Sequence, residues 1–324
     1  MDRTHIEWTD ATWNPLRGCE PVSAGCRNCY AARMAHRFST RPEDPYYGLT
    51  EMRGGRAVFN GRITVVESAL TLPLRWRRPR RIFVNSMSDL FHESVPDDVI
   101  ANVFGVMHAT PRHTYQILTK RPDRMAHWIN GRTGSEIAVH ALDLIGDHDK
   151  HFYRDVSRQV RGFPWPLPNV WIGTSVENQE AADVRLPHLC ATRARVRFVS
   201  CEPLLGPVSL HNLTLIRWVI AGGESGPGAR PMHPEWPRSL RDQCATTGVP
   251  FFFKQWGEWV EANLGNVDNA LEDRLLAISG HDETYLPIDR HDQSTVHMVR
   301  VGKRLSGNIL DGEVHQAFPE AAIS

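Results

Sequence analysis

The sequence lacks a net charge, a long apolar run and an apolar leader. Lysine plus arginine and aspartate plus glutamate number 37 each among 324 residues, so the formal charge at pH 7 is zero. The charge of the whole chain therefore gives no argument for nucleic-acid binding, and only a local patch could provide one. No apolar run approaches the roughly 18 residues of a membrane helix, and Met1–His5 lacks the apolar core of a signal peptide. These absences predict a cytoplasmic protein without a membrane span, whose thiols stay reduced.

Cysteine is also scarce, and half of it is concentrated near the start. Of six cysteines, Cys19, Cys26 and Cys29 form a C-x6-C-x2-C pattern in a loop that contains glycine and proline. A helical segment is predicted to begin directly after this loop, at Tyr30. The other three cysteines are scattered, and we expect them to be small buried side chains. Three thiolates on one loop can hold a single metal centre with one coordination position open.

Spacing alone leaves two kinds of metal centre open. A structural zinc ion could take the three cysteines and a fourth ligand such as His36 in a closed tetrahedron. An iron–sulfur cluster bound by three thiolates would instead leave one iron accessible to another molecule. Structural zinc sites usually take their ligands as two separated pairs, so the pattern favours the cluster. The zinc alternative describes a non-catalytic module that binds nucleic acid or protein.

Short apolar segments alternate with helical segments along most of the chain. A short strand is predicted at Ile6–Thr9. The later strand segments are Ile82–Asp89, Tyr115–Lys120, Val170–Glu177, Val196–Glu202, Arg217–Glu224 and Phe251–Gln255. Nearly continuous apolar strands that alternate with helices are typical of parallel βαβ units whose sheet is covered on both faces. We therefore predict an α/β fold, a partial parallel (β/α) barrel of about six strands.

The ends of the six later strand segments carry charged residues. They are Asp89, Lys120, Glu177, Glu202, Glu224 and Lys254. Right-handed crossovers place the carboxyl ends of parallel strands on one edge, where such folds have their active sites. The cysteine loop follows the first strand and is expected at the same edge. Glu202 and Lys120 could assist substrate binding or proton transfer there as catalytic residues, or they could form a structural ion pair.

The regular alternation covers only part of the chain. Residues 1–258 are predicted to form the barrel domain, and an insertion near residues 131–168 covers one side of the site or binds a partner. Residues 259–324 no longer alternate in this way, although they keep enough apolar residues to pack. We expect an appended β-containing subdomain there, with strands at Thr284–Ile288 and Thr295–Val301.

One segment is strongly basic. Five arginines surround Trp76 between residues 75 and 81, namely Arg75, Arg77, Arg78, Arg80 and Arg81. They could contact phosphates while Trp76 stacks on a base, which would make nucleic acid a partner. Alternatively, the segment is a solvated entry into the strand that follows.

Several motifs resemble a phage-derived three-Cys protein family, which in turn resembles the radical S-adenosylmethionine (SAM) superfamily. The first motif runs from Trp13 to Ala31 and contains the three cysteines. The others are Asn85–His92, Leu118–Pro122, Ile172–Glu177, Ser200–Leu204, Ala221–Gly226 and Lys254–Gly257. Together they span most of residues 4–258.

The resemblance implies a cofactor and a reaction. Cys19, Cys26 and Cys29 would hold a [4Fe–4S] cluster whose fourth iron binds the amino and carboxylate groups of SAM. One electron, from a donor such as a flavodoxin or ferredoxin, would cleave SAM to methionine and a 5′-deoxyadenosyl radical. The radical would abstract hydrogen from a substrate, for which nucleic acid or a nucleotide is the expected class.

The resemblance also implies binding residues for SAM. Ser86, Ser88 and Asp89 match the position that binds the SAM amino group, and Thr174, Ser175 and Glu177 match the ribose contacts. Gly222, Gly223 and Glu224 look like the superfamily's amino-binding triplet. Because they follow a late strand, we expect them to approach the adenine or the substrate instead.

The cysteine motif departs from the superfamily pattern at two points. The superfamily spacing is C-x3-C-x2-C with an aromatic residue before the last cysteine. Here the first gap has six residues, Asn28 precedes the last cysteine and the aromatic Tyr30 follows it. These departures concern the cleavage of SAM more than the binding of a cluster.

Overall fold

The computed structural model describes residues 4, 6–145, 164–262, 275–279, 285–286 and 295–320. Contacts within the chain divide it into two compact units. The first unit comprises Met1–Val22, Ala31–Thr174 and Pro187–Arg197, and the second comprises Ser23–Tyr30, Ser175–Leu186 and Phe198–Ser324. The domain boundary expected at residue 258 stays a prediction.

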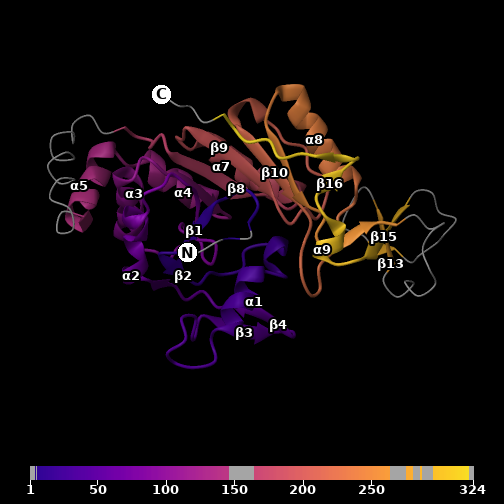
Figure 1. Ribbon diagram of the computed structural model, residues 1–324, viewed down its shortest axis with the longest axis horizontal. Coiled ribbons are helices and arrows are strands. Elements are labelled where there is room, and N and C mark those ends of the chain that lie inside the picture. Colours follow the sequence, from indigo (N-terminus) through magenta and orange to yellow (C-terminus); the bar gives the residue numbers. More distant parts are fainter. Residues whose placement is uncertain are drawn as a thin grey trace. The chain divides into compact units, whose positions relative to one another are not determined.

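Seven strands form the central sheet, in the order β1-β6-β7-β8-β9-β10-β11 (Figure 1). They are β1 (Ala11–Trp13), β6 (Arg81–Val84), β7 (Thr114–Thr119), β8 (Val170–Ser175), β9 (Val196–Cys201), β10 (Trp218–Gly222) and β11 (Phe251–Gln255). Within the first unit β1, β6, β7 and β8 pair in parallel, and within the second unit β9, β10 and β11 do. The order ends at β1 and β11, so the sheet is open. The predicted α/β class with a partial parallel barrel is confirmed.

The strands of the first unit are apolar because the sheet is covered. All six residues of β8 are buried, as are the last three of β6. Helices α3 (Asp97–Ala109) and α4 (Pro122–Asn130) follow β6 and β7, as predicted. Asp97 and Asp98 begin α3 directly after Pro96, where carboxylates stabilise the positive end of the helix dipole.

The predicted insertion begins with a helix, α5 (Gly134–Ile145). This helix packs closely on α3, because a Cβ at Gly105 would lie only 3.0 Å from Ala141 Cα. Residues 146–163 of the insertion lie outside the described residues.

The first predicted strand is wrong in position. The Thr9 amide donates to Ile6 O at 3.3 Å, which closes a turn, and the strand lies at β1 instead. Trp8 is buried in this turn, with its ring 4.7 Å from that of Phe83. The apolar residues of this segment therefore reflect a buried turn and not an extended strand.

Small elements surround the cysteine segment. Two antiparallel pairs occur in the first unit: β2 (Leu16–Arg17) with β5 (Thr64–Val65), and the hairpin of β3 (Thr50–Arg53) with β4 (Arg56–Phe59). The short helices are η1 (Ala24–Cys26), α1 (Tyr30–Arg37), α2 (Glu67–Leu70) and η2 (Leu72–Arg75). The helix predicted to begin at Tyr30 is thus confirmed.

The second unit places helices and a C-terminal arm around β9, β10 and β11. Helices α7 (Gln179–Ala191) and α8 (Glu235–Thr247) lie where helices were predicted, and only the single turn η4 (Leu213–Leu215) separates β9 from β10. The arm runs along β11, because the Phe253 amide donates to His315 O at 2.8 Å and the Ala317 amide to Phe251 O at 3.2 Å. This pairing covers a sheet edge that would otherwise expose backbone groups.

An antiparallel sheet of four strands forms near the C-terminus. Its order is β12 (Trp259–Glu261), β15 (Thr295–Arg300), β13 (Leu275–Ser279) and β14 (Tyr285–Leu286). A turn of helix, α9 (Lys303–Ser306), and a small hairpin of β16 (Ile309–Leu310) with β17 (Glu313–Val314) complete the chain. The expected β-containing C-terminal region is confirmed, although Thr284 and residues 287–288 of one predicted strand lie outside the described residues.

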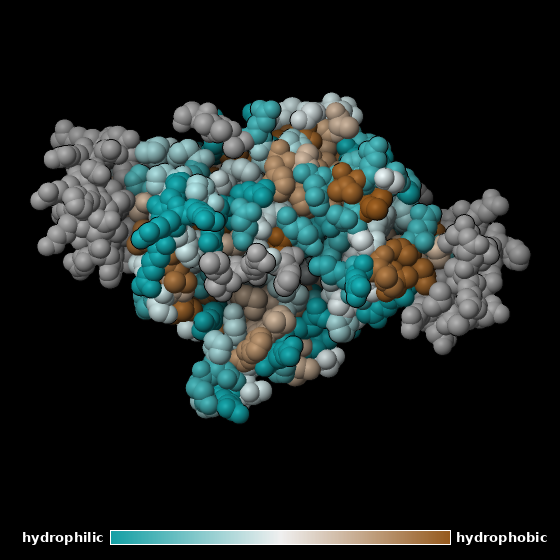
Figure 2. All heavy atoms as spheres, in the orientation of Figure 1, coloured by the Kyte–Doolittle hydropathy of each residue, from teal (hydrophilic) through white to brown (hydrophobic). Residues whose placement is uncertain are grey.

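Apolar surface is dispersed. Among the described residues, no helix is both long and apolar enough to cross a membrane. On the face that Figure 2 shows, apolar side chains gather in several small groups separated by hydrophilic ones. Neither observation points to a broad apolar contact surface on this face.

Candidate functional site

Asp89 joins the carboxyl ends of β6 and β7 in the first unit. Its carboxylate is 5% exposed and accepts hydrogen bonds from Phe91 N at 3.0 Å and Thr119 Oγ1 at 2.7 Å. Lys120 N donates to it at 3.3 Å, and Arg121 Nη1 at 3.2 Å. Asp89, expected to bind SAM, therefore holds two strand ends together, and Lys120 contributes its backbone to the same network.

Arg121 extends this network to the cysteine segment. Its buried guanidinium donates to Glu93 Oε2 at 2.9 Å and to Glu20 O at 3.5 Å. Burial acts to lower the pKa of Arg121, but the negative charges of Asp89, Cys19 and Glu93 outweigh it and raise this pKa. A cation beside a cysteine favours the thiolate, which is the form that binds metals.

The other residues predicted in the first unit also have protein partners. Ser86 Oγ donates to Asn14 Oδ1 at 3.1 Å, and Ser88 Oγ donates to Leu16 O at 3.0 Å. The buried Thr174 hydroxyl donates to Thr119 O at 2.8 Å. The structure thus brings these side chains to the carboxyl ends of β6, β7 and β8, where they hold the loops in place.

Asn85 is the polar group that the sequence analysis missed. It is 3% exposed and follows β6 with a φ of 59°, in the left-handed region. Its backbone amide donates to Trp13 O at 2.8 Å, but neither atom of its side-chain amide has a hydrogen-bond partner among the described residues. An unsatisfied buried amide costs about 1–3 kcal/mol, and strained backbone concentrates at ligand sites. Its position beside Ser86 was the only available signal in the sequence.

The second unit contains the other two cysteines of the motif. The amide of Cys29 donates to Cys26 O at 3.3 Å, so these two residues begin and end one turn, and η1 precedes it. All three motif cysteines are thiols of intermediate burial. By contrast, Cys201 and Cys244 are buried, and burial raises the pKa of Cys244 to about 12 and also raises that of Cys201. These two thiols stay neutral packing groups.

Asn28 fastens the cysteine turn to the loop that follows β10. Its side-chain nitrogen donates to Glu224 Oε2 at 2.8 Å and to Gly228 O at 2.7 Å, and the residue is 8% exposed. Arg230 Nη2 donates to Ala24 O at 3.0 Å, at the start of η1. Asn28 is therefore a polar anchor between the cysteine turn and a buried carboxylate.

Glu224 is the buried carboxylate of this anchor. Arg230 donates to it from its backbone amide and from Nε, both at 2.9 Å, and from Nη2 at 2.6 Å. Burial acts to raise the pKa of Glu224, but the hydrogen bonds from Arg230 and Asn28 outweigh burial and lower it. The carboxylate is therefore ionised at neutral pH and used in holding the cysteine turn.

Glu177 supports the same turn from another side. Arg185 Nη1 donates to Glu177 Oε2 at 2.7 Å and to Ser175 O at 2.8 Å, which fixes the loop after β8. A Cβ at Gly25 would lie 3.2 Å from Glu177 Cδ, so the backbone between Cys19 and Cys26 packs directly on this carboxylate.

Glu202 forms an ion pair, with Lys254 Nζ 2.7 Å from its Oε1. The structural alternative considered for Glu202 thus exists, with Lys254 as the partner. A Cβ at Gly222 would meet Glu202 Cδ at an ordinary 3.5 Å, whereas a Cβ at Gly223 would lie 1.9 Å from Trp256 O. Gly223 is therefore required by the backbone of Trp256, independently of any ligand.

Thiols are suitable metal ligands, but the described side chains do not form a ready metal site. In the described part of the chain, no group of three or more His, Cys, Asp or Glu side chains is arranged to hold a metal ion. His36, the fourth ligand of the zinc alternative, has its Nδ1 3.1 Å from Thr50 Oγ1.

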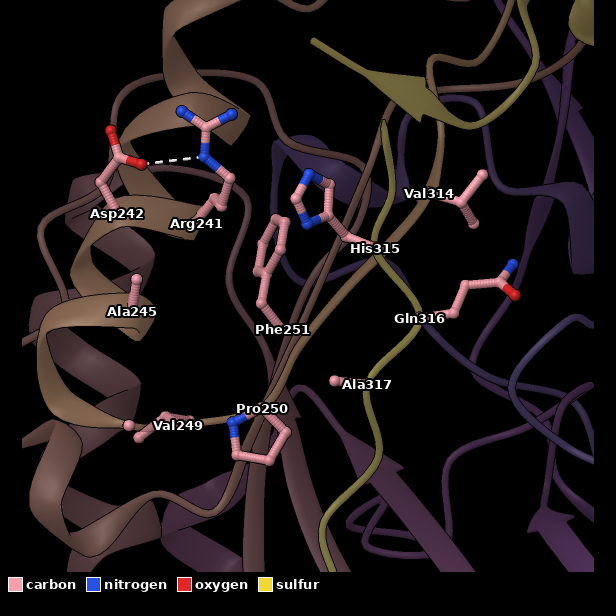
Figure 3. A pocket seen from close by; sticks show the side chains of 11 residues that line it. Arg241, Asp242, Ala245, Val249, Pro250, Phe251, Val314, His315, Gln316 and Ala317 are labelled. Atoms are coloured by element: carbon pink, nitrogen blue, oxygen red, sulfur yellow. Dashed lines mark hydrogen bonds and ion pairs between the residues drawn. The ribbon is translucent and has the colours of Figure 1, made fainter. Parts of the chain in front are cut away.

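A groove of about 560 Å³ lies elsewhere in the second unit (Figure 3). It is lined by α8, by Pro250 and Phe251 at the amino end of β11, and by the C-terminal arm from Val314 to Ala317. The predicted Lys254 lies toward the opposite, carboxyl end of that strand. The groove is therefore separate from the predicted site residues of this unit.

Comparison with known proteins places the chain in a family. Residues 3–319 match the family model described as "Protein of unknown function (DUF5131)". The chain belongs to the DUF5131 family. No curated protein and no solved structure gave a match.

The features of this DUF5131 chain fall into two sets. The first unit brings together Cys19, Ser86, Ser88, Asp89, Lys120 and Thr174 at or beyond strand ends, and the second contains Cys26, Cys29, Ser175, Glu177, Glu202, Gly222, Gly223 and Glu224. The carboxylates Asp89, Glu177 and Glu224 pair with arginines, and Glu202 pairs with Lys254. Lys120 enters its network through its backbone amide.

Neighbouring glycines provide a direct test of this packing. Gly223→Ala should lower the free energy of unfolding by about 1–3 kcal/mol, because its Cβ would overlap Trp256 O. Gly222→Ala, whose Cβ has ordinary contacts, is the matched control and should lose less. Urea unfolding followed by circular dichroism measures both. Equal stability of the two variants would mean that the Trp256 loop moves freely.

The Asn28 anchor can be tested in the same way. Asn28→Ala removes two hydrogen bonds and should cost about 1–3 kcal/mol of stability. Asn28→Asp should cost more, since it places a second carboxylate against Glu224. Arg27→Ala, at an exposed position of the same loop, should change little. Thermal unfolding and limited proteolysis at the loop give the ranking, and a cost for Arg27→Ala equal to that of Asn28→Asp would contradict the anchor.

Proposed function

We propose that this DUF5131 protein is an iron–sulfur enzyme of the radical SAM type. Cys19, Cys26 and Cys29 would hold a [4Fe–4S] cluster with one iron open to SAM. When bound, the cluster would supply the single electron that cleaves SAM. The chain's own residues would orient the thiolates, bind SAM and exclude water from the site.

The observation that carries this proposal is the anchoring of the cysteine turn. Its backbone is held at three points, by Arg230 on Ala24 O, by Glu177 against Gly25 and by Glu224 through Asn28. A short, partly exposed turn with two cysteines has no packing reason for three charged supports, two of which are buried carboxylates. Functional sites need such support, because ligands must be held within about 0.5 Å of the productive geometry.

The first unit supports the proposal through charge. The buried guanidinium of Arg121 bonds to Glu20 O and is influenced electrostatically by Cys19. It would stabilise a thiolate ligand and tune the properties of a bound centre, as groups around metal ligands commonly do. Asp89 fixes Arg121 for this task.

For SAM we propose a modified set of contacts. Ser86, Ser88 and Thr174 remain candidate ligand contacts, while Asp89 and Glu177 act by fixing loops through their arginines. Ser175 and Gly222 are likewise candidate ligand contacts, whereas Gly223 and Glu224 support the loops. We add Asn85, whose unsatisfied amide offers a donor and an acceptor at the carboxyl end of β6.

The remaining roles follow from this chemistry. Glu202 and Lys120 are proposed to assist the substrate, with Glu202 acting as a pair with Lys254. A reduced flavodoxin or ferredoxin is the proposed electron donor, and a nucleotide or nucleic acid the proposed substrate class.

Metal analysis tests the cluster. We expect about four irons and four sulfides per chain after anaerobic purification, with a visible absorption band that changes when SAM is added. The variant Cys19→Ala/Cys26→Ala/Cys29→Ala should lose both iron and colour, whereas Cys190→Ala, outside the motif, should keep them. One zinc per chain without iron would overturn the proposal in favour of the zinc-stabilised binding module.

Asn85→Gly separates ligand binding from folding. Glycine adopts a φ of 59° without strain and removes the unsatisfied amide, so stability should change by no more than about 1 kcal/mol. SAM binding to the reconstituted protein should weaken at least about tenfold, which corresponds to about 1.4 kcal/mol. The control is Asn212→Gly, because Asn212 is also left-handed, with a φ of 61°, but exposed. Unchanged affinity in Asn85→Gly would remove this residue from the SAM site.

A further inference from the structure

Five arginines gather at the amino ends of β6 and β7 in the first unit. We call them the arginine surface: Arg75, Arg77, Arg78, Arg80 and Arg112. Four come from the end of η2 and the segment that leads into β6, and Arg112 comes from the loop before β7. All except the half-buried Arg80 are exposed.

Arg112 was not part of the basic run in the sequence, and the fold adds it. Its Nε donates to Trp76 O at 2.8 Å, and its Nη2 donates to Leu74 O at 3.1 Å and to Pro73 O at 3.4 Å. The Thr114 amide also donates to Arg80 O at 2.9 Å. These bonds fix the backbone that carries the other arginines. The binding of a partner would therefore not include the free-energy cost of ordering this backbone.

Two residues of the predicted nucleic-acid contact have other tasks. Arg81 pairs with Asp10, since Nη2 lies 3.3 Å from Oδ1 and the Arg81 amide donates to Oδ2 at 2.7 Å. The guanidinium of Arg80 lies over the Trp76 ring, 5.1 Å from its centroid. Trp76 thus already has a cation over its ring. Base stacking by Trp76 stays a prediction, separate from the charge of this surface.

Carboxylates are rare around this surface, although the chain as a whole is neutral. Residues 68–88 contain no aspartate or glutamate, and neither do residues 99–122. Among the described residues, Arg75, Arg77 and Arg78 form no ion pair with a carboxylate. The charges of these three exposed arginines are therefore accessible.

The arginine surface lies at the opposite end of β6 and β7 from the candidate site residues of the first unit. Parallel pairing of β6 and β7 sends both amino ends to one edge, whereas Asp89, Lys120 and Arg121 follow the carboxyl ends. The six residues of β7 span about 20 Å at roughly 3.3 Å per residue. A partner on this surface is therefore held away from those residues.

We propose that the arginine surface binds the phosphate backbone of nucleic acid without reading its sequence. Guanidinium groups match phosphate oxygens with two parallel hydrogen bonds, and several fixed arginines match a chain of repeated phosphates. An acidic protein partner would need an apolar or aromatic centre within the contact, and the exposed side chains of this segment are arginines and Pro79. The proposal goes beyond the iron–sulfur function and does not depend on it.

Fluorescence anisotropy with a labelled DNA duplex of mixed sequence, about 24 base pairs long, tests the surface. The variant Arg75→Gln/Arg77→Gln/Arg78→Gln should bind at least about tenfold more weakly than the wild type at about 0.1 M salt. The slope of log K against log salt should fall in magnitude by about 2–3, since each phosphate contact contributes about 0.9.

The matched control is Arg37→Gln/Arg41→Gln/Arg56→Gln, which removes the same charge from exposed positions of the same unit. It should bind within about threefold of the wild type. The proposal would be wrong if both triple variants bound DNA equally weakly, or if the wild type did not bind DNA at all. It would also be wrong if only an acidic protein displaced the labelled DNA. Thermal unfolding confirms that each variant is folded.

Binding by the cluster-free variant Cys19→Ala/Cys26→Ala/Cys29→Ala separates this proposal from the proposed function. If that variant binds DNA like the wild type, the arginine surface stands whether or not a cluster forms. If it loses DNA binding while still folded, the contact belongs to the cysteine site and the proposal is wrong.

Discussion

Buried pairs of a carboxylate and an arginine underlie the organisation of this protein. Each carboxylate belongs to a buried residue that follows a parallel strand, and it accepts hydrogen bonds from an arginine later in the chain. The pairs are Asp89–Arg121, Glu177–Arg185 and Glu224–Arg230. A buried charge is tolerated only when it is paired, and removing one partner typically costs about 3–5 kcal/mol. Each pair therefore fixes the loop beyond its strand.

This constraint changes how the strand ends can act on a ligand. A carboxylate that already accepts several hydrogen bonds is a support for its neighbours, and direct contact with a ligand passes to neutral groups beside it. We propose Asn85 as such a group, because its buried side-chain amide has no hydrogen-bond partner among the described residues and lies next to the loop that Asp89 holds. The cysteine turn is supported in the same manner, with Asn28 as the link to Glu224 and with Gly25 packed close to Glu177.

Parallel strands also give the first unit two chemically different ends. The carboxyl ends bear the network of Asp89 and Arg121 beside Cys19. The amino ends bear the arginine surface, with Arg112 tying its backbone down. Because the strands run in one direction, the Asp89–Arg121 network and the arginine surface could exchange ends only if the fold were different. The first-unit residues of the proposed reactive site and the proposed nucleic-acid surface therefore lie at opposite ends of β6 and β7.

The sequence by itself determined the strand and helix pattern and the positions of the charged strand ends. β8 and α3 follow directly from an apolar run and from a helical period that begins after Pro96, because these signals are local. The strand expected at Ile6–Thr9 failed because a buried turn gives the same apolar pattern. Only the tertiary structure decided which charged groups pair, since Arg121 lies 32 residues beyond Asp89 and Arg230 meets a turn some 200 residues earlier. Burial and pairing depend on neighbours in space, and no local pattern contains them.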